Sequence, residues 1–128
     1  MTISEFTKRF LAVFAAGVPE KLIKKYVLST DEYENYLWHL FSYELLPRER
    51  YLSGDEARKA YDRADKKGAE YLERDWSGEP ERTKEVTYEQ KSAAALDKYV
   101  EVYVVSKDFD WVYMKTHEHS LGPYFMKV

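Results

Sequence analysis

The clearest alternation of hydrophobic and polar segments lies in the last thirty residues. Residues 99–105 form a run rich in aromatic and β-branched side chains, and residues 111–119 form a second such run. The polar residues 106–110 separate the two runs. Two strand-like runs joined by a short polar linker are typical of an antiparallel hairpin. The pattern therefore predicts a C-terminal β-hairpin.

Helical periodicity dominates the beginning of the chain. Apolar residues recur every three or four positions over residues 4–16, which predicts an amphipathic helix. Gly17 suits the position just after a helix, and Pro19 suits the first turn of the next one. The second helix is expected to run to about residue 28. Together they predict an N-terminal helical hairpin.

The middle of the chain has a less regular pattern. The aromatic-rich run 36–43 fits either a helix that is apolar nearly all round or a strand buried on both faces, and we favour the strand. The capping box Ser53–Glu56 predicts a helix that ends before Gly68. Residues 69–76 fit an edge strand or two helical turns, and we expect the edge strand. Residues 77–86 hold glycine, proline and many charges, which predicts a loop.

These elements define the expected fold class. We expect an α+β domain with an antiparallel three- to four-stranded sheet, helices packed on the sheet, and the helical hairpin at the N-terminus. A chain of 128 residues has the length of a single domain, which we place over residues 1–128. Aromatic residues make up 16% of the chain, a share that argues against global disorder.

Charge and composition narrow the classes of function. The net charge is −3 and the basic residues are spread among acidic ones, so we expect no nucleic-acid partner. The absence of cysteine excludes disulfides and thiolate chemistry. No apolar run reaches the roughly 18 residues of a membrane span, and the N-terminus lacks the layout of a signal peptide. We therefore expect a cytoplasmic protein with no membrane association, and no motif indicates a cofactor.

A possible metal site lies at the end of the last predicted hairpin. His117 and His119 are two residues apart, so on a strand they share one face and could hold one metal ion together. Zinc or iron would need a third ligand from elsewhere in the fold. The alternative is that both imidazoles form local hydrogen bonds at the strand end. The helical pattern of zinc proteases, H-E-x-x-H, is absent from the sequence.

Three other residues could take part in chemistry. His39 lies inside an apolar aromatic run, where it is either a buried neutral imidazole or a base whose pKa is tuned by its surroundings. Asp108 and Asp110 could act as paired carboxylates, but aspartates in a hairpin turn normally serve turn geometry. We favour the structural interpretation for all three.

Two functions remain in contention. The first is a non-catalytic protein-binding module that neutralises or regulates a partner protein, as an immunity protein or an inhibitor does. Aromatic side chains dominate the binding energy of protein interfaces, so we expect four of them to contact the partner. These are Trp76, Tyr113, Tyr124 and Phe125. The alternative is a small metal-dependent hydrolase that uses His117 and His119 as ligands.

Three blocks of the sequence resemble a known family. They are Leu37–Tyr43, then Gly54–Ala57, and then a long block over 102–125 that includes Thr116–Glu118 and Gly122–Phe125. In these blocks the chain resembles a domain-of-unknown-function family of small proteins from Bacillus-like bacteria. The resemblance implies a bacterial origin and a shared fold. It implies no particular activity, because that family has none established.

Overall fold

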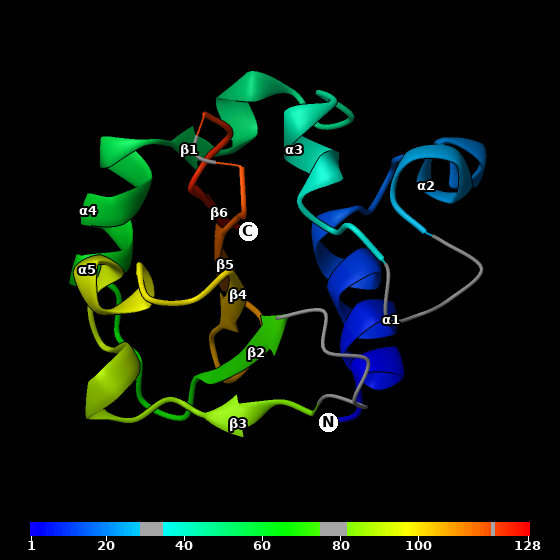
Figure 1. Cartoon of the computed structure of the whole chain (residues 1–128). Helices are drawn as coiled ribbons and strands as arrows, with labels where there is room; N and C mark the ends of the chain where they lie inside the picture. Colours follow the sequence, from blue (N-terminus) through cyan, green and yellow to red (C-terminus); the bar gives the residue numbers. More distant parts are fainter. Residues whose placement is uncertain (29–34, 75–81, 119) are drawn as a thin grey trace.

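The computed structural model describes residues 1–28, 35–74, 82–118 and 120–128. The helices are α1 (Ile3–Phe14), α2 (Glu20–Tyr26), α3 (His39–Ser42), α4 (Asp55–Arg63) and α5 (Ala93–Leu96), with 3-10 turns η2 (Arg48–Arg50) and η3 (Tyr88–Gln90). The strands are β1 (Leu52–Ser53), β2 (Glu70–Arg74), β3 (Lys84–Glu85), β4 (Glu101–Val105), β5 (Trp111–Lys115) and β6 (Tyr124–Lys127). The α+β class and the antiparallel sheet are confirmed (Figure 1). None of the described helices is long and apolar enough to cross a membrane.

The described strands form one sheet of six, in the order β1-β6-β5-β4-β2-β3. The predicted hairpin is confirmed by the pairing of β4 with β5, in which Val102 lies opposite Lys115 and Val105 opposite Val112. The expected count of three to four strands was too low. Both edge strands, β1 and β3, have only two residues each. β6, with four residues, was also not predicted. Strands this short show little or no alternation of polar and apolar residues, so the sequence pattern does not reveal them.

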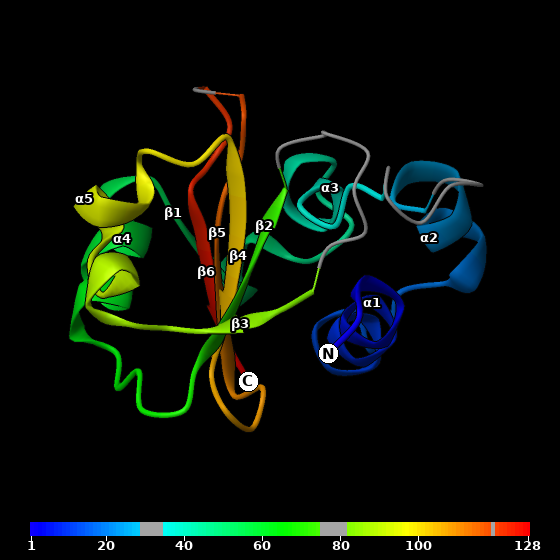
Figure 2. The same cartoon turned by 60° about the horizontal axis from the view of Figure 1, so that its bottom comes forward.

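Helices cover both faces of the sheet (Figure 2). α1, α2 and α3 lie on one side, and α4 and α5 lie on the other. Side chains alternate between the two faces of a strand, so β4 contributes to two cores. Tyr103 and Val105 join the core under α1 and α3, whereas Val102 and Val104 join the core under α4 and α5. Every residue of β4 is therefore buried.

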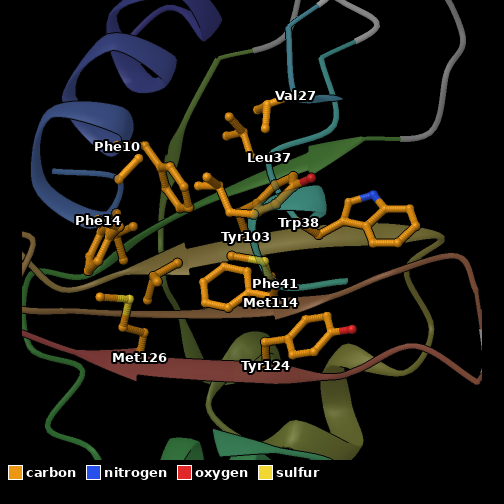
Figure 3. Close-up of a cluster of buried hydrophobic side chains, with 14 of the residues drawn as sticks. Phe10, Phe14, Val27, Leu37, Trp38, Phe41, Tyr103, Met114, Tyr124 and Met126 are labelled. Carbon is orange, nitrogen blue, oxygen red and sulfur yellow. The ribbon is translucent and has the colours of Figure 1, made fainter. Parts of the chain in front are cut away.

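The core under α1 and α3 is largely aromatic (Figure 3). Phe6 and Phe10 of α1 lie 6.3 and 6.4 Å from the ring of Tyr103, measured between ring centroids. From α3, Phe41 stacks on Tyr124 of β6 at 5.2 Å. The apolar face predicted for the first helix is thus the face that covers the sheet.

The strand predicted over residues 36–43 is wrong, because this segment contains the helix α3. The Ser42 amide donates to the Trp38 carbonyl and the Tyr43 amide to the His39 carbonyl, each at 3.1 Å. Apolar residues on all sides of a short run fit a buried helix and a buried strand equally well. Here Leu37, Trp38, Leu40 and Phe41 are all buried, so tertiary packing explains the pattern that favoured a strand.

The strand predicted over residues 69–76 is confirmed as β2 within 70–74, but it is not an edge strand. β3 pairs with its outer side, through Tyr71 opposite Lys84 and Glu70 opposite Glu85. β3 falls within the predicted loop 77–86, so that prediction was wrong at residues 84–85. Residues 75–81 lie outside the described part of the chain.

Leu72 of β2 offers a test of this core. Its side chain is fully buried among the aromatic residues under α1, so Leu72→Ala should lower the free energy of unfolding by about 2–5 kcal/mol. Leu52→Ala is the matched control, because Leu52 is 38% exposed on the edge strand β1 and its loss should cost less than about 1 kcal/mol. Urea unfolding of both variants measures the difference. Equal losses would contradict the assigned core.

Candidate functional site

Two neighbouring groups of side chains make up the candidate site. One, the buried polar cluster, consists of Arg74, Glu101, Tyr103 and His117. The other, the aromatic surface, consists of Tyr26, Tyr36, His39 and Tyr43. Trp38 joins them, because its indole packs edge-on against His39 at 4.4 Å and against His117 at 5.5 Å.

The buried polar cluster is built on the pairing of β2 with β4. Arg74, the last residue of β2, lies directly opposite Glu101, the first residue of β4. Side chains of opposed residues share a face of the sheet, and these two are 1% and 0% exposed. A buried charge is costly unless it has partners. The guanidinium donates from Nη1 to the Asn35 carbonyl at 3.2 Å, and its charge partly offsets the rise in the pKa of Glu101 that burial causes.

Two further groups hold the Glu101 carboxylate. The Tyr103 hydroxyl donates to Oε2 at 2.8 Å, and Nδ1 of His117 lies 3.1 Å from Oε1. Burial raises the pKa of Glu101, and its hydrogen bonds with Tyr103 and His117 act in the opposite direction. Burial also raises the pKa of Tyr103, which keeps this hydroxyl protonated as a donor. The cluster is therefore a carboxylate surrounded by donors inside the fold.

His117 connects this cluster to the solvent. It lies just beyond β5, and about a third of its side chain is exposed. The contact of Nδ1 with Oε1 of Glu101 holds the ring in one orientation. The other nitrogen, Nε2, lies 3.5 Å from Oε1 of Glu118. A carboxylate that holds one imidazole nitrogen is a common support for histidines that bind metals or transfer protons.

The aromatic surface joins the end of α2 to α3. The rings of Tyr26 and Tyr43 are 5.3 Å apart, and His39 stacks on Tyr36 at 5.0 Å and meets Tyr43 edge-on at 4.8 Å. His39 Nδ1 lies 2.7 Å from the Tyr26 carbonyl, which can only accept, so Nδ1 is the donor. Tyr43 is 55% exposed and forms the outermost part of this surface.

The electrostatic surroundings of His39 favour its neutral form. Burial lowers the pKa of His39 below its ordinary value of 6.5. The hydrogen bond to the Tyr26 carbonyl raises this pKa, and the nearby charge of His117 lowers it. The structure thus agrees with the interpretation of His39 as a partly buried neutral imidazole bonded to a backbone carbonyl.

The residues predicted to contact a partner lie mostly inside the fold. Tyr113, Tyr124 and Phe125 are 0%, 4% and 7% exposed. Tyr113 stacks on Tyr61 at 4.5 Å in the core under α4. Trp76 lies outside the described residues. Partner contact by these four side chains stays a prediction, and their burial directs attention to other aromatic residues.

The predicted metal pair is only half described, because His119 lies outside the described residues. Over the described ranges, no group of three or more histidine, aspartate or glutamate side chains is placed to hold a metal ion. Metal binding by His117 and His119 therefore stays a prediction. Asp108 and Asp110 are exposed on the β4–β5 turn, where the Asp110 amide donates to Oγ of Ser106 at 2.6 Å. Their surroundings agree with a role in the turn.

Sequence reasoning missed Arg74, Glu101 and Tyr103. One signal for them existed: Glu101 is the single charged residue in the apolar run 99–105. A charge in a strand buried on both faces needs a partner on a neighbouring strand. The pairing register, which places Arg74 opposite, follows only from the folded sheet.

Removing the Glu101 charge should be costly. Glu101→Gln removes the buried negative charge that lies opposite Arg74 and accepts from Tyr103, and we expect a loss of about 1–3 kcal/mol in the free energy of unfolding. The double variant Arg74→Met/Glu101→Gln should lose less than the sum of the two single variants, because the two charges face each other across the pairing of β2 with β4. Lys24→Ala, which breaks an exposed pair with Glu20, is the control and should cost less than about 1 kcal/mol. Strictly additive losses in urea unfolding would show that Arg74 and Glu101 are not coupled.

Comparison with known proteins identifies the family of this chain. A search of curated proteins and a search of solved structures each found no match to this chain. A protein-family model, by contrast, matches residues 3–125, which is nearly the whole chain. The chain therefore belongs to the family described as a domain of unknown function, DUF4275.

Proposed function

We propose that this domain is a non-catalytic protein-binding module that neutralises or regulates a partner protein, in the manner of an immunity protein or an inhibitor. The partner would contact the aromatic surface between α2 and α3. The observation that carries the proposal is the position of Tyr43, which is 55% exposed and packed against both Tyr26 and His39.

The physical properties of this surface suit an interface. Tyrosine offers a large contact area with few rotatable bonds, so ordering it on binding costs little entropy. The ring contacts of Tyr43 with Tyr26 and His39 already restrict it in the free protein. The ammonium of Lys25 lies 5.2 Å from the ring centroid of Tyr26 and adds a charged group beside the rings. Aromatic centres with a polar rim are the usual anatomy of protein interfaces.

A matched pair of tyrosines tests the proposal. Tyr43→Ala removes the exposed ring of the aromatic surface, and Tyr88→Ala removes an 86% exposed ring on η3, at the opposite helical layer. Tagged protein would be cross-linked in the cells that naturally produce it, and the captured proteins quantified by mass spectrometry. We expect one stoichiometric partner with the wild type and with Tyr88→Ala. Tyr43→Ala should recover about tenfold less, the loss expected when a central aromatic contact is removed.

Two results would contradict this proposal. The first is equal recovery of the partner by Tyr43→Ala and the wild type, which would show that the interface lies elsewhere on the protein. The second is the absence of any stoichiometric protein with the wild type under conditions where the tagged chain is folded and abundant.

A second candidate function is a small metal-dependent hydrolase. The specific observation in its favour is the support of His117 by the buried Glu101 carboxylate at 3.1 Å. Metal-binding histidines usually donate their other ring nitrogen to such a carboxylate, which fixes the ring and raises its basicity. In this proposal, Nε2 of His117 and the side chain of His119 would be ligands, and the metal would activate a water molecule for hydrolysis.

Titration with zinc distinguishes this second function from the first. We expect wild-type protein to bind one Zn²⁺ per chain in isothermal titration calorimetry if the hydrolase proposal is right, and His117→Ala to lose this binding. His39→Asn is the control, because His39 is bonded to the Tyr26 carbonyl instead of to a carboxylate and should not affect zinc binding. If zinc binding is unchanged in His117→Ala, or if the wild type binds no zinc, the hydrolase proposal is wrong.

A further inference from the structure

A groove lies at the end of the sheet that carries the β4–β5 turn, on the side covered by α4. One wall is the end of α4 with the segment that follows it, and the other is the turn with the start of β5 and the end of β6. Figure 2 shows the segment after α4 and the β4–β5 turn at the same end of the sheet. The groove has a volume of about 910 Å³, which is within the range of small-molecule sites.

The base of the groove carries two polar side chains that are almost fully buried. Trp111 is 6% exposed and Ser106 is 8% exposed, and both line the groove together with Phe125. The indole Nε1 of Trp111 is accessible, unlike that of Trp38, and no acceptor among the described residues takes its hydrogen. Buried indole N–H groups usually have such a partner. Nε1 of Trp111 is therefore a donor that is open to a molecule in the groove.

The Ser106 hydroxyl is a second donor. Its Oγ accepts from the Asp110 amide at 2.6 Å and from the Trp111 amide at 3.3 Å, so both lone pairs face the turn. A hydroxyl whose lone pairs are both occupied can make one more bond, as a donor. In the described part of the chain, no oxygen accepts this hydrogen. The groove thus presents two donors that lack an acceptor.

A cation stands beside each donor. Lys127 of β6 lies directly opposite Trp111 in the pairing of β5 with β6, so the two side chains share a face of the sheet. Lys107 follows Ser106 in the turn, and its side chain packs against Gly68, where an added Cβ would lie 3.1 Å from Cδ of the lysine. Both lysines line the groove. Because hydrogen bonds to ionised acceptors are the stronger ones, donors flanked by ammonium groups favour an anion over a neutral acceptor.

The other charged side chains of the groove lie on its exposed rim. They are two cations and four carboxylates, namely Arg63, Lys67, Asp65, Glu85, Asp108 and Asp110. Together with Lys107 and Lys127 they make the groove neutral overall. Exposed charges are screened by water and salt, so the choice of ligand depends on the buried donors at the base.

We propose that this groove binds a small organic anion, whose carboxylate or phosphate group accepts from Nε1 of Trp111 and from the Ser106 hydroxyl. Lys107 and Lys127 balance the charge of that group, and the apolar part of the molecule lies against Phe125. The site is on the opposite helical layer from the aromatic surface, so it does not depend on the function proposed above.

An NMR titration of isotope-labelled protein tests the site. The probes are phenyl phosphate and benzoate, which carry the two anionic groups on the same ring, and benzamide is their neutral counterpart. We expect the Nε1–H signal of Trp111 to shift saturably with at least one anion, and the tighter of the two identifies the ligand as a phosphate ester or a carboxylate. Benzamide should bind about tenfold more weakly. The Nε1–H signal of Trp38, enclosed in the other core, is the internal control and should not shift.

Two lysine variants locate the binding. The double variant Lys107→Gln/Lys127→Gln should weaken binding of the preferred anion by about tenfold. Lys98→Gln is the matched control, because Lys98 is also exposed but lies beside Glu89, outside the groove, and its loss should leave the affinity unchanged.

Four outcomes would each overturn the proposal. They are the absence of a saturable Trp111 shift with either anion below about 10 mM, equal affinity for benzamide, an equal shift of the Trp38 signal, and unchanged affinity in the double variant. The first three need only the wild type, so the test stands even if the double variant folds poorly.

Discussion

The burial of β4 on both faces is the constraint on which the rest of this structure depends. A strand covered on both sides must supply side chains to two separate cores, and each core needs its own helical layer. α1 and α3 cover one face, and α4 and α5 cover the other. The same burial acts on Glu101, the one charged residue of the strand. Its carboxylate is kept inside the fold by Arg74, Tyr103 and His117, so the candidate site is a consequence of how the central strand is covered.

The parts of the fold that sequence analysis predicted are those with a long, regular pattern. The β4–β5 hairpin and α1 each show a clear pattern. α1 lies within two residues of its expected bounds, whereas β4 begins two residues later and β5 ends four residues earlier than the predicted runs. β1 and β3 are too short to show any period. The strand prediction for residues 36–43 was wrong for a different reason. Leu37, Trp38, Leu40 and Phe41 are buried, but the more exposed positions of the run also carry rings, those of Tyr36, His39 and Tyr43, so the run has no polar face from which a period could be read.

Because residues 36–43 were predicted as a strand, a contact within the candidate site was not predicted. Residues 39 and 43 lie one turn apart on a helix, and their rings meet at 4.8 Å. On a strand the same two positions would be about 13 Å apart, so no contact between them could be expected. His39 and His117 were recognised as single residues, because histidine is rare in this chain and chemically distinctive. Arg74 and Glu101 lie opposite each other because of the register in which β2 pairs with β4. No local pattern in a single sequence indicates that register.

The two-residue edge strands bear on how this domain can meet other chains. Leu52–Ser53 closes one side of the sheet, and the charged pair Lys84–Glu85 closes the other. An edge that short gives an incoming strand almost no ladder of hydrogen bonds to extend, and charge on it discourages stacking of sheets into fibres. Recognition through the backbone, by strand addition, is thus a poor route into this fold. A partner that approaches β1 or β3 would therefore depend on side-chain contacts, which single substitutions can change.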